Sequence, residues 1–151
     1  MKTMGLFAVG ILAALSSCTI ETSDNGKLDG FWHLERIDTL DTGNSGDYSQ
    51  KRIFWGVENK LIHIKDVDTA SEQFYLRFEQ TSDQLQITKA YADHWHQDRG
   101  DNGGDIPVDQ PTDDLRHLGI NALPETFQKE ALDGSKMVLR SDRFRLYFKK
   151  F

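Results

Sequence analysis

The stretch Gln73-Phe74-Tyr75-Leu76-Arg77-Phe78-Glu79 decides the fold. Its large apolar side chains, Phe74, Leu76 and Phe78, occupy every second position, with more polar residues between them. Successive side chains of a β-strand point to opposite faces. The pattern therefore predicts a strand with one buried face and one face in water.

The same alternation recurs on both sides of this stretch, between short turns rich in Gly, Asp, Asn and Ser. We expect strands over residues 30–38, 50–57, 61–67, 73–79, 85–87, 126–132, 136–140 and 144–151. Strands with one apolar face at hairpin spacing are typical of antiparallel sheets. The predicted fold is all-β, an up-and-down eight-stranded antiparallel barrel with little helix, because closure removes exposed edges. An open sandwich with a similar strand count is the alternative.

The first 17 residues are predicted to be a signal peptide. Lys2 supplies a positive start, and residues 4–15 form an uncharged apolar run that is too short to span a bilayer. The next residues, Leu15-Ser16-Ser17-Cys18, resemble the lipobox of bacterial lipoproteins. The resemblance implies that Cys18 carries the lipid and becomes the mature N-terminus.

The predicted organisation is a signal peptide at 1–17, a lipidated tether at 18–29 and a barrel domain at 30–151. A chain of 151 residues fits one domain. The formal net charge of −6 argues against nucleic acid and against polybasic attachment to anionic lipid. We expect an exported protein, anchored by its lipid in the cell envelope at the outer membrane.

Gly30-Phe31-Trp32, at the start of the first expected strand, resembles the Gly-x-Trp signature of lipocalins. The resemblance implies that Gly30 and Trp32 are structural residues at the barrel floor. It also implies that Trp32 packs under a basic residue near the last strand, for which Arg143 and Arg145 are the candidates. The mature chain resembles small lipocalin-like lipoproteins of Bacteroidetes, mostly of unassigned function. The chain lacks the cysteine pair of classical lipocalins, which puts their ligand chemistry in doubt.

The apolar faces of the expected strands suggest two functions. They could line a cavity for a small apolar ligand, with candidate binding residues Trp32, Trp55, Phe74, Leu76, Phe78, Phe144, Leu146 and Phe148. Alternatively, these side chains fill the barrel completely, as in many small barrels. The protein would then be a cell-surface module that docks a protein or a glycan. The long segment 91–123 would be a lid in the first case and a docking loop in the second, with one helical turn expected at 113–119.

Metal and cofactor chemistry have little support in the sequence. His94 and His96 would share one face of a strand and form at most a weak two-ligand zinc or copper patch, so we predict no metal and no cofactor. The stretch 98–105 is rich in side-chain oxygens, as calcium-binding loops are. Gly100, which has no side chain, occupies a position where such a loop needs an oxygen ligand, and this argues against calcium.

We also predict that the protein is not an enzyme. The sequence contains no Gly-x-Ser-x-Gly elbow, no His-Glu-x-x-His and no phosphate-binding glycine loop. His33 with Glu35, and His63 with Asp66, are close enough in sequence to form acid–base pairs. Both histidines lie opposite the apolar face of their strands, so we expect them to be solvent-exposed.

Overall fold

The chain forms a closed antiparallel barrel. The structure, a computed structural model, describes residues 23–70, 73–93 and 105–151. Neighbouring barrel strands pair in the order β1 (Gly30–Thr39), β3 (Ile53–Glu58), β4 (Leu61–Asp66), β5 (Phe74–Gln80), β6 (Gln84–Ala92), β8 (Glu125–Leu132), β9 (Lys136–Arg140) and β10 (Phe144–Lys150). The ring closes where β10 pairs with β1.

The predicted fold class is confirmed, and all eight barrel strands lie at the expected places. Two further strands fall in segments expected to be loops: β2 (Asn44–Asp47) pairs with β1, and β7 (Ile106–Val108) pairs with β6. Both are short and carry no buried side chain. They therefore lack the alternation of buried and exposed residues that reveals a half-buried strand.

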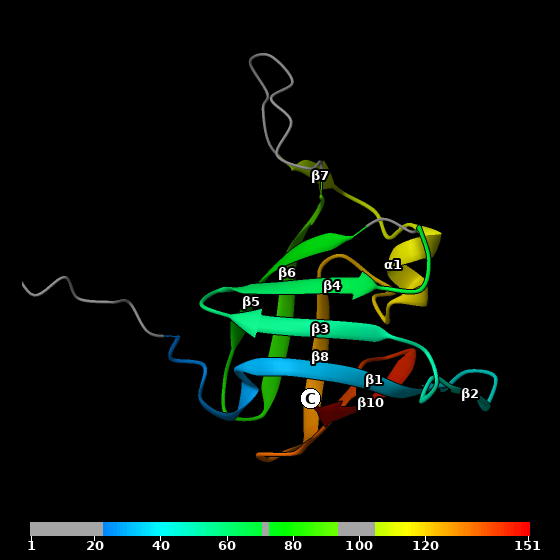
Figure 1. Cartoon of the computed structure of the whole chain (residues 1–151), viewed down its shortest axis with the longest axis horizontal. Helices are drawn as coiled ribbons and strands as arrows, with labels where there is room; N and C mark the ends of the chain where they lie inside the picture. The colour runs from blue at the N-terminus through cyan, green and yellow to red at the C-terminus, as the bar shows by residue number, and fades with distance from the viewer. Residues whose placement is uncertain (1–22, 71–72, 94–104) are drawn as a thin grey trace, which may run out of the picture.

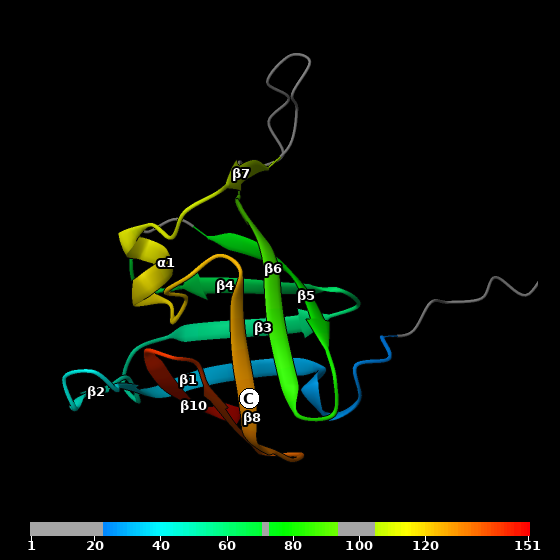
Figure 2. The ribbon, with the colours of Figure 1, turned by 180° about the vertical axis from the view of Figure 1, so that it is seen from behind.

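The barrel is built from crossing layers. Strands β1, β3 and β4 lie on one side, while β6 and β8 cross behind them (Figures 1 and 2). The short 3-10 helix η1 (Gly26–Leu28) and the helix α1 (Asp113–His117) lie at opposite ends of strands β1, β3 and β4. Among the described residues, no helix is long and apolar enough to cross a membrane.

Helix α1 confirms the expected helical turn. Thr112 caps it by accepting a hydrogen bond from the backbone N–H of Leu115 through its side-chain oxygen, at 3.2 Å. Asp113 and Asp114 occupy the first turn, where negative charge is favourable. After the helix, Gly119 adopts φ +101°, a backbone conformation that L side chains rarely adopt.

The folded domain begins before Gly30. Residues 23–29 fall in the expected tether, but the structure packs them against the barrel, with Leu28 fully buried. The Asp29 carboxylate accepts a hydrogen bond from the backbone N–H of Asn25, and Ser23 accepts one from the backbone N–H of Asn59. Residues 23–29 are thus packed with the barrel in the structure, which the sequence did not indicate because one buried Leu among polar residues gives no periodic signal.

Candidate functional site

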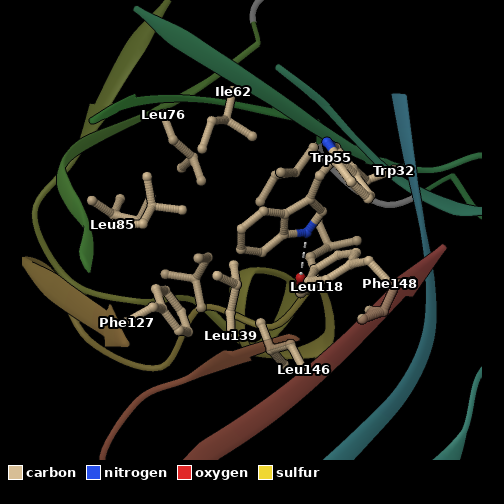
Figure 3. Close-up of a cluster of buried hydrophobic side chains, with 14 of the residues drawn as sticks. Trp32, Trp55, Ile62, Leu76, Leu85, Leu118, Phe127, Leu139, Leu146 and Phe148 are labelled. Carbon is tan, nitrogen blue, oxygen red and sulfur yellow. Dashed lines mark hydrogen bonds between the residues drawn. The ribbon is translucent and has the colours of Figure 1, made fainter. Parts of the chain in front are cut away.

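The barrel interior, the first candidate ligand site, is occupied by the protein's own side chains. All eight residues proposed to line a cavity point inward and are buried, each at most 8 % exposed. Zero accessible surface is left on Trp32, Trp55, Phe74, Leu76 and Leu146. A void large enough for a water molecule would leave accessible surface on the side chains around it. Figure 3 shows Leu76, Phe127, Leu146 and Phe148 around Trp55 in the barrel interior.

Trp55 organises the centre of this core. Its ring lies 5.0 Å from the Phe148 ring and 6.2 Å from the Phe127 ring, the latter in an edge-to-face arrangement. Its indole N–H donates to the backbone carbonyl of Leu118 at 3.0 Å (Figure 3). The buried polar atom of the largest core side chain is therefore satisfied by the segment that follows α1.

Trp32 lies at the end of the barrel that η1 covers. Its indole N–H donates to the Leu28 carbonyl at 2.8 Å, and the Lys150 ammonium lies 4.9 Å from its ring centroid. Gly30 allows this approach: it adopts φ +125°, and a Cβ there would lie 2.5 Å from the Lys150 side chain. The expected structural roles of Gly30 and Trp32 therefore have a physical basis.

The basic partner expected for Trp32 was wrong. Arg145 pairs with Glu130 at 2.8 Å, and Arg143 lies near Asp41 at 3.8 Å. Arg145 has outward parity on β10, because Phe144 and Leu146 point inward, and Arg143 lies in the turn just before the strand. Lys150 has the same parity as these inward residues and is the register partner of Trp32.

The opposite end of the barrel is closed by α1 and the residues after it. Leu115, Leu118 and Ile120 are fully buried and form a plug over the core. His117 anchors this plug to the barrel wall: its Nε2 lies 3.0 Å from the buried carboxylate of Asp66 on β4. The part of segment 91–123 from α1 to Ile120 is therefore packed into the end of the barrel, whereas β7 carries no buried side chain.

A polar hollow of about 600 Å³ lies beside the plug, with Glu125, Arg140 and Arg143 among its lining residues. The buried Glu125 carboxylate accepts hydrogen bonds from the backbone N–H groups of Asn121 and Ala122, at 2.8 and 3.3 Å. Burial raises the pKa of Glu125, although these hydrogen bonds act in the opposite direction. Glu125 thus fastens the loop that follows the plug.

The outer face of the barrel carries a row of aromatic side chains across five strands. Phe31, Gly56, His63, Tyr75 and Tyr91 are successive cross-strand partners on β1, β3, β4, β5 and β6. We call these residues the outer aromatic row. All are exposed or partly exposed, opposite in parity to the core side chains of the same strands.

Three rings of this row each stack on a neighbouring ring, which covers one of their two faces. His63 and Tyr75 stack with centroids 4.7 Å apart, and Phe31 stacks on Phe54 at the same distance. The Phe31 ring leans over Gly56, where a Cβ would lie 3.3 Å from it. The missing side chain at Gly56 leaves room for the Phe31 ring on the outer face of β3.

Two hollows lie along the row and form what we call the outer groove. One, of about 690 Å³, is lined by Phe31, Gly56, His63 and Tyr75 together with Asp29, Glu58, Asn59 and neighbouring residues. The other, of about 500 Å³, is lined by Leu61, Tyr75, Arg77, Tyr91 and Asp105. Leu61 and Tyr75 line both hollows, so the groove is continuous across β3, β4, β5 and β6.

Sequence reasoning missed this site, although a signal was present. Tyr75 and Phe31 are large rings at positions whose parity places them outside the barrel. Outward strand positions of a half-buried sheet are usually polar. An aromatic residue at such a position is the signal. What the sequence does not give is the register that aligns residues from five strands into one row.

The remaining candidates are dispersed or fall outside the described residues. His94 and His96 lie outside them, as does most of the stretch 98–105. Within the described ranges, no three His, Cys, Asp or Glu side chains gather as a metal site. His63 contacts Gln73 at 3.0 Å and not Asp66, whose carboxylate faces His117, so that proposed acid–base pair was wrong.

Comparison with known proteins gives a family and two similar structures. The model of the lipocalin-like domain family matches residues 13–151. A lipocalin-like protein from Bacteroides uniformis is 18 % identical with a TM-score of 0.59, covering 83 % of this chain and 100 % of its own. An uncharacterized protein from Bacteroides eggerthii is 20 % identical with a TM-score of 0.53, covering 82 % and 98 %. Among curated proteins, nothing matches this chain.

Proposed function

This chain belongs to the lipocalin-like domain family, and we propose that it uses this barrel as an interaction module of the cell envelope. In this proposal the filled barrel is a scaffold, Cys18 carries the lipid anchor, and the partner binds on the outer surface along the outer groove. Of the two functions that the sequence suggested, this one takes precedence over an apolar ligand held inside the barrel.

The observation that carries the proposal is the burial of the eight inner side chains described above, each at most 8 % exposed and five of them with zero accessible surface. A ligand pocket typically occupies roughly 300–1,000 Å³. The interior side chains with zero accessible surface include Trp55, Leu76 and Phe127, which come from opposite walls. An internal ligand would therefore have to displace core side chains or the plug formed by Leu115, Leu118 and Ile120.

We propose a binding role without catalysis. His33 and Glu35 do form a close pair, with 2.6 Å between Nδ1 and Oε1. The other ring nitrogen of His33 contacts the backbone carbonyl of Lys51, so both nitrogens have partners. A histidine held in this way has no nitrogen ready for a substrate proton.

The proposal is tested by titrating an apolar fluorescent probe, a dansylated long-chain fatty acid, against a soluble chain of residues 19–151. The described residues of that chain include the whole barrel. We expect no saturable site of one probe per chain. Saturable binding that quenches the core tryptophans and persists when Tyr75 is changed to Leu would overturn the proposal, because it would place the ligand inside.

A further inference from the structure

We propose that the outer groove binds a neutral oligosaccharide, whose sugar rings stack on the outer aromatic row. The inference rests on the proposed function, since it assigns a ligand class to the outer surface of a filled barrel. It follows from three properties of the groove: the geometry of its rings, the polar groups along its rim and the balance of its charges.

Phe31, His63 and Tyr75 line the groove, and each is stacked on one face with a neighbouring ring. His63 and Tyr75 are nearly parallel, with 18° between their planes, and Phe31 and Phe54 are parallel to within 14°. The face of an aromatic ring is electron-rich and attracts the slightly positive edges of other groups. A pyranose ring exposes C–H groups on its faces and hydroxyls around its edge, so it can stack on such a surface while its hydroxyls remain free to bond.

The rim supplies hydrogen-bonding groups beside the rings. Glu58 and Asn59 line the groove next to Phe31 and His63, and Arg77 lies next to Tyr75. Burial raises the pKa of the Tyr75 phenol, and the carboxylates of Asp93 and Asp105 add to the effect. The Tyr75 hydroxyl therefore remains a donor at neutral pH. Sugar hydroxyls both donate and accept, which matches a rim of carboxylates, an amide, a phenol and a guanidinium.

The charges of the groove favour a neutral ligand. Carboxylates at Asp29, Glu58 and Asp105 accompany the cation of Arg77, so the described residues that line the groove form no cationic cluster to hold a phosphate or an anionic lipid. A purely apolar ligand or protein face would remove water from these charged groups without replacing their hydrogen bonds, which costs free energy.

The length of the groove favours a chain of sugars over one sugar. The outer aromatic row crosses five strands, from β1 to β6. Neighbouring strands lie about 4.8 Å apart, so the row extends roughly 20 Å, enough for several linked rings. One ring would contact only one stacked pair, either Phe31 with Phe54 or His63 with Tyr75.

The test screens the soluble chain of residues 19–151 on an array of neutral and acidic oligosaccharides, followed by calorimetric titration of the best binder. The variants are Tyr75→Leu and the exposed Arg77→Ala. Tyr147→Leu is the matched control, because Tyr147 is also a partly buried tyrosine on an outer strand face but lies on β10. Melting temperatures confirm that each variant is folded.

We expect saturable binding of a neutral oligosaccharide that Tyr75→Leu weakens about tenfold, equivalent to roughly 1.4 kcal/mol. Arg77→Ala should weaken it less, and Tyr147→Leu should leave it unchanged. No binding on the array, binding of acidic sugars only, or binding insensitive to both groove variants would overturn the inference. If the oligosaccharide inference fails but the dansylated fatty acid also finds no site inside the barrel, the proposed function still holds. If the probe does bind inside the barrel, the proposed function fails as well.

Discussion

At the scale of single residues, Gly30 determines how one end of the barrel closes. Its φ of +125° is a backbone conformation that L side chains rarely adopt, and a Cβ there would also displace the end of the Lys150 side chain. We predict that Gly30→Ala lowers the free energy of unfolding by about 1–3 kcal/mol, measured by urea denaturation. Gly134→Ala is the control, because nothing lies within 4 Å of a Cβ built there and its φ is not positive. Equal effects of the two substitutions would contradict this account of Gly30.

Glu125 makes stability depend on pH. Its pKa is raised above the ordinary 4.5 in the folded chain, mainly by burial, so the folded state holds this proton more tightly than the unfolded state. The resulting contribution to stability is present below pH 4.5 and is lost as pH rises through the folded-state pKa. We therefore predict that the stability of Glu125→Gln relative to wild type increases between pH 4 and pH 7. A constant or opposite difference in urea denaturation would refute this prediction.

Lys150 illustrates what residue patterns do and do not predict. Alternation along β10 places Phe144, Leu146 and Phe148 inside, and the same parity extends to residue 150. Lys150 is a basic residue on the face of β10 that otherwise carries apolar, inward side chains, so it could have been recognised as the partner of Trp32. The lipocalin resemblance instead directed attention to Arg143, which lies just before the strand, and to Arg145, which has outward parity on it.

At the scale of elements, α1 acts as a plug because its one buried residue, Leu115, joins Leu118 and Ile120 over the core. We predict that Leu115→Ala lowers the free energy of unfolding by about 2–5 kcal/mol, through lost burial and a residual cavity. The neighbouring Arg116→Ala should change it by about 0.5 kcal/mol or less, since Arg116 is exposed and its ion pair with Asp113 lies on the surface. Chemical denaturation of both variants checks the difference, and a mild effect of Leu115→Ala would mean that α1 is not part of the core.

The strands were predictable because each one carries its own two-residue period, and the barrel buries one face of every strand. Strands β2 and β7 were not predictable in this way. They are held by backbone pairing with β1 and β6, respectively, and carry no buried side chain of their own. The outer aromatic row depends on register between five strands. Bulges shift that register, for instance between Arg77 and Phe78, and alternation within one strand does not encode such shifts.

At the scale of the whole molecule, the proposed protein consists of a lipid anchor and a filled barrel whose binding surface lies on the outside. We predict that Cys18→Ala moves the protein from the membrane fraction to the soluble fraction. The lipid is the proposed anchor, and each buried CH₂ contributes about 0.8 kcal/mol to membrane binding. Fractionation with quantitative blotting measures the shift, and a variant that stays with the membrane would show that another segment holds it there.

The central claim is that the barrel contains no space for a ligand, and crystals pressurised with xenon test it most directly. Xenon enters apolar cavities of sufficient size and is visible by its anomalous scattering. The account predicts no xenon among Trp55, Leu76 and Phe127 in the wild-type barrel, and a new xenon site in Leu115→Ala as a positive control. An ordered xenon peak within the wild-type core would contradict the claim and return the function to an internal apolar ligand.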